Sequence, residues 1–405
     1  MESAGRYSYT CTMHILLFIL IIAVFGLVTS TVFTGMTLAA VPRYLRERRE
    51  ALVQLKTGPE FTPPLTLLKP LHGTEPDLEE HLASFFEQDY PEYEVLFCAR
   101  TDDDAGLMTA RQVAKRYPAI PARFFWTGEP PYINAKAASM ELMEEEARYD
   151  ILVISDSDVR VTPDYLRSVA LPFVDGNVGG MTCLYRGVAA EGGLWARLEA
   201  VGMSVEMTSG VLVARMLEGM QFTLGPTMAF RREAIHRMGG FGVTADYCSD
   251  DFVLGNEIWK QGQKIVLSHH VIDHMVINAS LAASLNHQVR WMKSTRFSRP
   301  RGHIGTALTY SVPFGLLGWA TATAMGHPFW GLGLLGLSLV TRLALAIAVG
   351  RMVVRDTSWF GLLVLYPIRD VMGIGCWVAS YFSSHIVWRG RLFQLLPGGK
   401  MRAAE

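Results

Sequence analysis

Cysteine is scarce in this chain, with only five residues in 405 and no Cys-x-x-Cys pair. An odd and scattered set of cysteines argues against a disulfide framework and against structural zinc, and it fits a reducing compartment. We expect most of these side chains to be buried thiols: Cys11, Cys98, Cys183, Cys248 and Cys376.

An excess of charge of one sign is also missing, because 37 Lys and Arg residues are balanced by 38 Asp and Glu residues. No predicted strand interleaves aromatic and basic residues in the manner of a nucleic-acid platform. Nucleic acid is therefore not expected as a partner.

Apolar residues, in contrast, make up 50% of the chain, and its mean hydropathy is positive. Residues 15–41 carry no charge and exceed the roughly 20 residues that cross a bilayer, which predicts a transmembrane helix. The run is too long for the apolar part of a cleaved signal peptide and lacks its basic start. The basic cluster that follows, Arg43, Arg46, Arg48 and Arg49, predicts that the next domain faces the cytoplasm.

Short apolar runs alternate with helical patterns from residue 64 to about 277. This alternation predicts an α/β domain with a mostly parallel sheet flanked by helices. The strand ending at Leu71, followed by HGTEPDLEEHL with Glu75, resembles a nucleotide-binding first crossover. Both residues are candidate contacts to a nucleotide.

Four segments follow from these patterns. We expect a membrane anchor with its basic segment in residues 1–50, a cytoplasmic catalytic domain in 51–278, an amphipathic interfacial helix in 279–303, and a transmembrane region in 304–405. A solvated basic face is the alternative for residues 279–303. Apolar stretches at about 304–328, 329–349 and 359–388 are consistent with spans, but three simple spans place the basic C-terminal end on the wrong side. The third stretch, interrupted by Arg369 and Asp370, is therefore either an interfacial piece plus a span or a hairpin.

Asp156 and Asp158 end a strand-like run, DILVISDSD, with one residue between them. Alternate side chains of a strand point to one face, here at the carboxyl end where open α/β sheets bind ligands. Paired carboxylates at that place suit Mg²⁺ or Mn²⁺ carrying a diphosphate, although a solvated turn gives the same pattern. We expect Asp158 to hold the metal and Asp156 to be shared between metal and nucleotide.

Other polar residues supply the remaining parts of a sugar-nucleotide site. Asp251 is placed to act as general base with Asp250 tuning it, although helix capping is the plain alternative. Asp104, after an earlier strand, suits the base or ribose of a nucleotide. Lys136 has the charge and reach for a phosphate. Arg290 suits a diphosphate, and Trp291 offers a stacking face.

These motifs resemble the ceramide glucosyltransferases, lipid-modifying members of the family 2 glycosyltransferases. The resemblance rests on KPLHGTEPDLEEHLASFFEQDYPEYEVLFCARTDDD, DSDVR, SDDF and the RW pair. It implies a GT-A fold, an inverting mechanism, UDP-glucose or a related UDP-sugar as donor and a membrane lipid as acceptor. By motif position it also implies that Asp104, Asp156 and Asp251 are the three family aspartates.

One position departs from the resemblance, because His287 stands where the Q/R-x-x-R-W signature begins. Histidine donates a hydrogen bond but is only partly charged near neutral pH. The acceptor is therefore open between ceramide and another lipid, since bacterial hopanoid glycosyltransferases look similar too.

Three other functions stay open beside lipid glycosylation. A processive polysaccharide synthase shares the aspartates but needs more spans. A D-x-D-x-T phosphohydrolase would need a hydroxyl where Arg160 stands, and a non-enzymatic lipid-binding protein leaves the spaced acids unexplained. His270 and His274 lie in a strand pattern, which separates them by about 13 Å and excludes a shared zinc ion.

Overall fold

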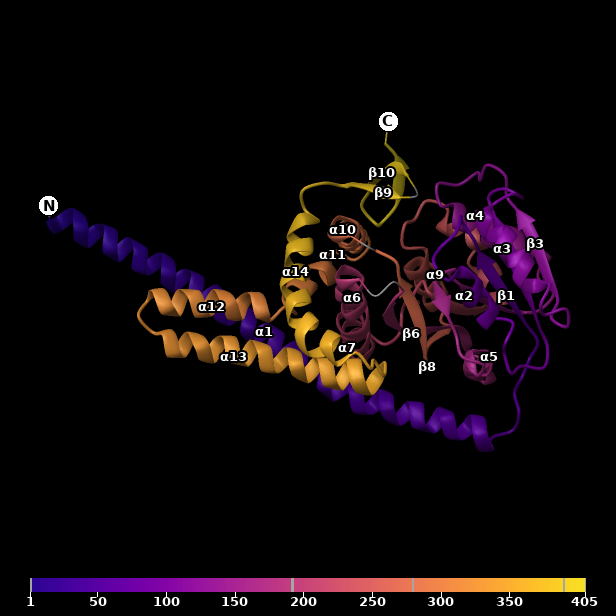
Figure 1. Cartoon of the computed structure of the whole chain (residues 1–405), viewed down its shortest axis with the longest axis horizontal. Coiled ribbons are helices and arrows are strands. Elements are labelled where there is room, and N and C mark those ends of the chain that lie inside the picture. Colours follow the sequence, from indigo (N-terminus) through magenta and orange to yellow (C-terminus); the bar gives the residue numbers. More distant parts are fainter. Residues whose placement is uncertain (1, 191–192, 279, 389, 405) are drawn as a thin grey trace.

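The computed structural model describes residues 2–190, 193–278, 280–388 and 390–404. Helix α1 (Glu2–Thr57) projects from the rest of the molecule at its N-terminal end (Figure 1). Its 56 residues form a rod about 84 Å long at 1.5 Å per residue. Phe18 and Phe25 on this rod are 64% and 58% exposed, as expected of side chains that face lipid. The predicted N-terminal apolar helix is therefore present and continues 16 residues beyond Val41, to Thr57.

The α/β body is built on an eight-stranded mixed sheet in the order β3-β2-β1-β4-β7-β6-β8-β5. Strands β1 to β4 are mutually parallel, β7 runs antiparallel to β4 and β6, and β6 and β8 are parallel. Residues of β1, β2 and β4 are buried throughout, because helices cover both faces and the strands are continuous apolar runs. The strands are β1 (Leu65–Pro70), β2 (Tyr93–Ala99), β3 (Ala122–Trp126), β4 (Ile151–Ser155), β5 (Val159–Arg160), β6 (Val178–Ala189), β7 (Thr227–Arg231) and β8 (Lys264–Val276).

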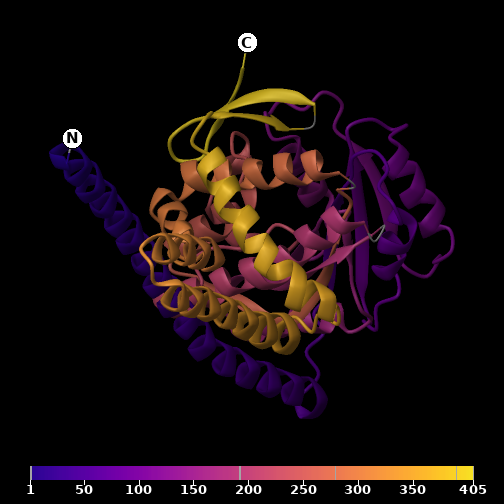
Figure 2. The ribbon, with the colours of Figure 1, turned by 60° about the vertical axis from the view of Figure 1, so that its left-hand side comes forward.

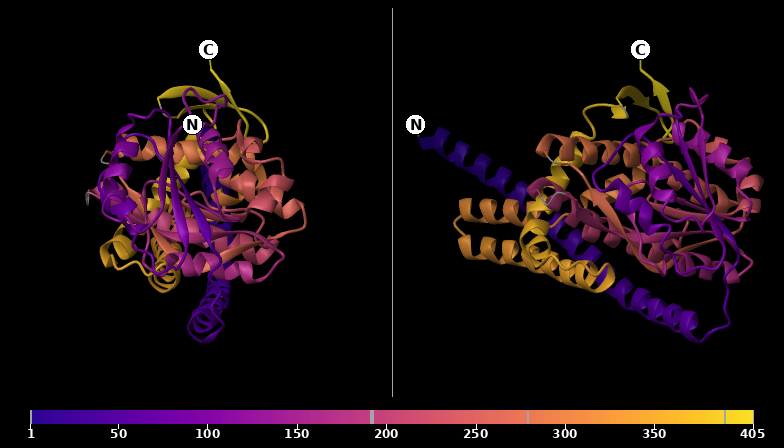
Figure 3. Two further views of the ribbon diagram at one scale, coloured as in Figure 1. Left: turned by 90° about the vertical axis from the view of Figure 1, so that its right-hand side faces the viewer. Right: turned by 45° about the vertical axis from the view of Figure 1, so that its right-hand side comes forward.

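Short helices connect these strands and lie beside the sheet (Figure 3). The α/β class and the mostly parallel sheet predicted from the alternating pattern are confirmed. The connecting helices are α2 (Leu78–Ser84), α3 (Ala105–Ala114), α4 (Ala135–Glu146), α5 (Tyr165–Ala170), η1 (Leu171–Val174), α8 (Arg232–Arg237), η3 (Phe241–Thr244) and α9 (Asp250–Lys260).

Four helical segments among the described residues are long and apolar enough to cross a membrane: Cys11–Thr57, Leu194–Glu218, Pro328–Val353 and Gly361–Ala379. The second was not predicted. It consists of α6 (Leu194–Val201), η2 (Gly202–Met207) and α7 (Thr208–Glu218), and it lies between the sheet and the C-terminal helices (Figure 1). Glu199 and Glu206 interrupt its apolar pattern, which hid it in the sequence.

The C-terminal stretches differ from the prediction in two places. The stretch 304–328 is not one helix, because four residues separate the end of α11 (Pro300–Ala307) from the start of α12 (Val312–Ala324). Helix α12 has 13 residues and is too short for a simple span. The stretch 359–388 is η5 (Gly361–Leu365) plus α14 (Tyr366–Ala379), after which a strand begins at His385. Between them, α13 (Pro328–Leu345) and η4 (Ala346–Val353) form one long helix.

Arg369 and Asp370 remain inside a helix because buried partners neutralise them. Arg342 lies 3.0 Å from Asp370, and each side chain is 3% exposed. The other oxygen of Asp370 accepts the backbone N–H groups of Ser311 and Val312, at 2.8 and 2.7 Å. Charges within apolar helices are tolerated when they pair in this way. The pair therefore fixes the break before α12.

The last described residues form a small antiparallel sheet, so the segment 304–405 contains strands as well as the predicted apolar helices. Its strands β9 (His385–Trp388), β10 (Arg391–Leu395) and β11 (Met401–Ala403) lie over α10 (Leu281–Ser298), as Figure 2 shows. Gly398 N–H donates to the Phe297 carbonyl oxygen at 3.1 Å, and Met401 N–H donates to that of Asp246 at 2.6 Å. The C-terminus therefore covers α10 and the loop before α9. The predicted interfacial helix corresponds to α10 and α11, and its first residue, 279, lies outside the described residues.

All five cysteines are free, and three of them are buried: Cys98, Cys183 and Cys376. The expectation that most are buried thiols is confirmed.

Candidate active site

Asp104 caps α3 and holds two loops together. Its carboxylate accepts the backbone N–H groups of Gly106 and Leu107 at 2.9 and 3.3 Å, and that of Gly73 at 3.0 Å. Leu71, at the start of the loop that contains Gly73, donates its N–H to the Cys98 carbonyl oxygen at 2.8 Å. All hydrogen bonds of the Asp104 carboxylate among the described residues are with backbone groups. Its contact with a nucleotide stays a prediction.

Lys136 lies between two of the predicted site carboxylates. Its Nζ is 2.7 Å from Asp156 Oδ1 and 3.5 Å from Asp250 Oδ2. Asn134 begins α4 by accepting the backbone N–H of Lys136, which sets the direction of the lysine. Burial lowers the pKa of Lys136, but the two aspartates outweigh it and the net pKa is raised. The lysine is therefore a fixed cation that joins the loop after β4 to the start of α9.

A second lysine, Lys69, was not among the predicted site residues. Its Nζ donates to the backbone oxygen of Asp156 at 2.6 Å and lies 3.7 Å from the centre of the Phe85 ring. The side chain is fully buried, and burial lowers its pKa to about 7. It supports the loop after β4 from inside the fold.

Asp158 pairs with a histidine of β8. Its Oδ2 is 3.1 Å from His274 Nε2, and burial, which disfavours the carboxylate, is outweighed by this histidine, so the pKa of Asp158 is lowered. The Tyr185 ring lies 5.3 Å from that of His274. Burial raises the pKa of Tyr185, and the charges of Asp251 and Asp158 raise it further. Tyr185 therefore stands between the two groups of acids.

The carboxylates around Asp158 have the character of a divalent-metal site. Asp158 Oδ1 and Glu75 Oε2 are buried and have no hydrogen-bond partner among the described residues. Ser157 Oγ donates to Glu75 Oε1 at 3.1 Å, and burial together with Asp158 raises the pKa of Glu75 to about 7. The described residues contain no group of three or more His, Cys, Asp or Glu side chains arranged to hold a metal by themselves. Mg²⁺ is commonly held by one or two carboxylates plus substrate phosphates, which these residues fit.

Asp251 is a partly buried carboxylate in the first turn of α9. Its oxygens accept the backbone N–H groups of Gly225 and Phe252, each at 2.8 Å. A Cβ at position 225 would lie 3.3 Å from Asp251 Oδ2, so glycine permits this close approach. Burial and the charge of Asp250 raise the pKa of Asp251 to about 6. A raised pKa near neutrality is what a general base requires.

Helix α10 places the RW pair beside the loop of the aspartates. Arg290 interacts with the Cys248 thiol, two residues before Asp250. The Ser249 hydroxyl is hydrogen-bonded to that of Ser294 at 2.6 Å, which joins α10 to the start of α9. Trp291 packs against the main core.

His287, the departure in the RW signature, is held by a buried carboxylate. Its Nδ1 is 2.6 Å from Glu199 Oε1, and Glu199 is 2% exposed. Asn278 and Ser284 also donate to Glu199, at 3.0 and 2.6 Å. The His287 ring lies 4.4 Å from that of Trp291. The helix α6 therefore positions the RW pair through one carboxylate.

Four site residues escaped sequence reasoning: Lys69, Tyr185, Glu199 and His274. Each lies in an apolar strand or helix, where a core role is the ordinary interpretation. The sequence offered a signal for two of them, because Lys69 and Glu199 are charged residues in otherwise apolar runs, and buried charges are rare unless they are paired.

The arrangement agrees with the site expected from the sequence. A mixed sheet carries aspartates on the loops after β2 and β4, a partly buried carboxylate with a raised pKa lies in the first turn of α9, and Lys136 lies between two of the acids. The class of protein, a glycosyltransferase, follows from the family match. The sequence profile of glycosyl transferase family 21 matches residues 20–401, and the chain belongs to that family.

Known relatives agree with this family. Ceramide glucosyltransferase 1 of Caenorhabditis elegans is 24% identical over 361 residues, which cover 86% of this chain and 76% of the relative. Ceramide glucosyltransferase 3 of the same organism is 22% identical over 359 residues, with 84% and 74% covered. Among solved structures, a mannosyltransferase of Pyrobaculum calidifontis in complex with GDP-Man and Mn²⁺ aligns at a TM-score of 0.48 and 19% identity, covering 87% of this chain and 99% of that one.

Replacement of Glu199 tests its role in holding α10. Glu199→Ala leaves the donors of His287, Asn278 and Ser284 without their acceptor, and we expect the free energy of unfolding to fall by about 3 kcal/mol. Glu199→Gln keeps one acceptor oxygen, so its free energy of unfolding should fall by less than that of Glu199→Ala. Thermal unfolding of the purified protein in detergent measures both, with the exposed Glu145→Ala as control. Equal stability of Glu199→Ala and the control would contradict the role.

Proposed function

We propose that this protein transfers a hexose from a UDP-sugar to a hydroxyl group of a membrane lipid, with inversion at the sugar carbon. UDP-glucose is the favoured donor and ceramide the favoured acceptor. The observation that carries the proposal is Asp251, a partly buried carboxylate whose pKa is raised to about 6 and which directly follows Asp250, a partner of the Lys136 cation.

Asp251 acts as the general base in this proposal. It accepts the proton of the lipid hydroxyl while that oxygen attacks the sugar carbon from the face opposite the diphosphate. Asp250 keeps the pKa of its neighbour high, and the two backbone N–H groups hold the carboxylate in one orientation. Inversion follows because a single displacement places the new bond opposite the old one.

The leaving diphosphate needs positive charge at the other side of the sugar. Mg²⁺ or Mn²⁺, when bound, supplies a Lewis acid that neutralises this diphosphate. Asp158, Glu75 and Asp156 are the residues that would hold it, because Asp158 Oδ1 and Glu75 Oε2 have no hydrogen-bond partner among the described residues and the Asp156 side chain is partly exposed. Lys136 and Arg290 add fixed cations near the same loops.

Membrane attachment supports a lipid acceptor. Helix α10, which carries Arg290 and Trp291, packs against α14 and α6, and both belong to candidate spans. The family relatives named ceramide glucosyltransferases make ceramide the first candidate. A hopanoid or another lipid is the second candidate, because His287 replaces the Gln or Arg of the signature.

The basic residues after the first span place the catalytic domain on the cytoplasmic side in this proposal. Arg43 and Arg46 are largely exposed, with side chains 63% and 68% accessible, as expected of residues at a membrane surface. The phosphohydrolase alternative draws less support, since Arg160 is engaged with Asp273 at 3.1 Å.

The direct test is an assay of the purified full chain with labelled UDP-hexoses and with ceramide or hopanoid acceptors in detergent micelles. We expect transfer to one lipid class, and a loss of at least about 100-fold in Asp251→Asn, because general-base catalysis is worth roughly that factor. Mass spectrometry identifies the product. No transfer to any lipid, or full activity in the variant, would refute the proposed reaction.

The acid side of the pH profile tests the base. Asp251 accepts a proton only when ionised, so kcat should fall as the pH drops below about 6. Asp250→Asn removes the neighbouring charge that raises this pKa, and the acid limb should move to lower pH. Asp246→Asn, an exposed acid in the same loop, is the control. An acid limb that stays in place in Asp250→Asn would argue against Asp251 as the titrating group.

Metal dependence tests Asp158 separately. Asp158→Ala should raise the Mn²⁺ concentration needed for half-maximal activity by about tenfold or more, since ligand loss commonly costs at least that in affinity. Asp150→Ala, a 96% exposed acid at the other end of β4, should leave it unchanged. An unchanged requirement in Asp158→Ala would show that other groups hold the metal.

A further inference from the structure

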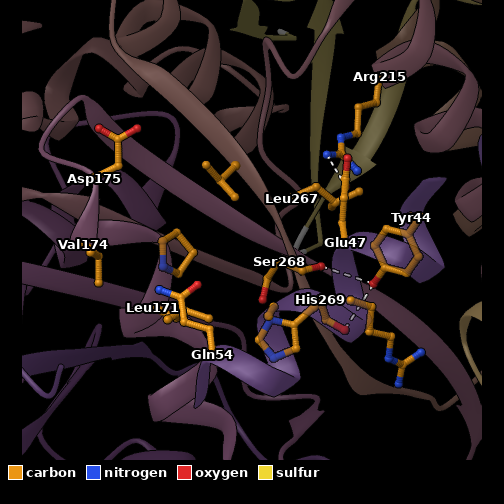
Figure 4. Close-up of a pocket in the computed structure, with 14 residues that line it drawn as sticks. Tyr44, Glu47, Gln54, Leu171, Val174, Asp175, Arg215, Leu267, Ser268 and His269 are labelled. Carbon is orange, nitrogen blue, oxygen red and sulfur yellow. Dashed lines mark hydrogen bonds and ion pairs between the residues drawn. The ribbon is translucent and has the colours of Figure 1, made fainter. Parts of the chain in front are cut away.

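A pocket of about 400 Å³ lies away from the candidate active site, between α1 and the sheet. Its lining comes from α1, from the segment after α5, from α7 and from β8 (Figure 4). The residues are Tyr44, Glu47, Arg48, Ala51, Gln54, Leu171, Pro172, Val174, Asp175, Arg215, Val266, Leu267, Ser268 and His269. His274, which pairs with Asp158, lies five residues further along β8 than His269, or roughly 16 Å away. The pocket is therefore separate from the reacting groups.

The carboxylates of the pocket already have cationic partners. Glu47 lies 2.6 Å from Arg215, and Asp175 lies 2.8 Å from Lys264. Arg48, which is 9% exposed, donates to the Val353 carbonyl oxygen at 2.9 Å and has no carboxylate partner among the described residues. The pocket thus contains a buried cation whose charge is not neutralised by the protein.

His269 adds a second unmet polar group. It is 8% exposed, and its Nε2 has no hydrogen-bond partner in the described part of the chain. Burial, with His270 and Arg48 nearby, lowers the pKa of His269 to about 4, so the ring is neutral at pH 7. Tyr44 holds this strand in place by donating to the carbonyl oxygens of Ser268 and His269, at 3.2 and 3.3 Å (Figure 4). A buried polar group without a partner is destabilising unless a ligand satisfies it.

The pocket begins at the depth of lipid headgroups. Tyr44 is three residues beyond Val41, the end of the apolar run, and Arg48 is seven beyond it, or about 5 and 10 Å along the helix axis. The headgroup layer extends roughly 5–8 Å beyond the hydrocarbon core on each side, so on an upright helix Tyr44 lies within this layer and Arg48 lies just beyond it. Arg215 belongs to a second candidate span, Leu194–Glu218, three residues from its end. Two candidate spans therefore end at this pocket.

We propose that the pocket binds the phosphate-bearing headgroup of a membrane phospholipid. In this proposal the phosphate oxygens accept hydrogen bonds from Arg48 and from His269 Nε2–H, and the glycerol and ester region contacts Leu267 and Val174, which also line the pocket. Basic pockets between membrane helices commonly hold such headgroups. The site is independent of the sugar-transfer reaction.

Thermal unfolding of the delipidated full chain in detergent tests the site with three probes: dihexanoyl phosphatidylglycerol, dihexanoylglycerol and inorganic phosphate. We expect only the phospholipid to raise the melting temperature in a saturable way. Arg48→Gln should weaken its binding at least about tenfold. Arg46→Gln, an exposed arginine on the same helix that does not line the pocket, should bind as the natural protein does.

A second variant guards against misfolding of Arg48→Gln. Val174 is 51% exposed at the wall of the pocket, so Val174→Trp should block the site while leaving its charges in place. An equal rise in melting temperature with inorganic phosphate would overturn the proposal in favour of a free-anion site. An equal rise with dihexanoylglycerol would overturn it in favour of nonspecific apolar binding. The proposal would also be overturned if Val174→Trp bound the phospholipid as tightly as the natural protein does. The same holds if Arg46→Gln lost as much affinity as Arg48→Gln.

Discussion

The position of Lys136 between Asp156 and Asp250 is the interaction on which the candidate site depends. The two acids come from different elements, the loop after β4 and the first turn of α9. Without a cation between them, two carboxylates in a buried space would repel each other and one would become protonated. The lysine therefore permits the loops to meet, and its effect reaches Asp251 as well.

The fold class and the aspartates could be predicted because their signals are local. Apolar runs that alternate with helical patterns define the parallel part of the sheet, and Asp104 and Asp156 each end such a run. The long N-terminal helix follows from its uncharged run. The sequence also placed Asp250 and Asp251 correctly at the start of a helix.

The remaining features depend on contacts between distant segments. Leu194–Glu218 was missed because Glu199 and Glu206 break its apolar pattern, and only tertiary partners such as His287 and Arg369 explain those charges. The role of His274 depends on Asp158, which lies 116 residues earlier in the chain. The terminal sheet was not predicted, because its apolar side chains pack on residues of distant segments, among them Phe297 of α10 and Cys248 before α9.

The hydroxyl contacts between Ser249 and α10 have a mechanical consequence. Ser294 and Ser298 of α10 both lie within hydrogen-bond distance of Ser249, which directly precedes Asp250. Helix α10 in turn packs against α14 and α6, which belong to candidate membrane spans. A displacement of either helix would therefore reach the start of α9, and with it the candidate base, without passing through the sheet.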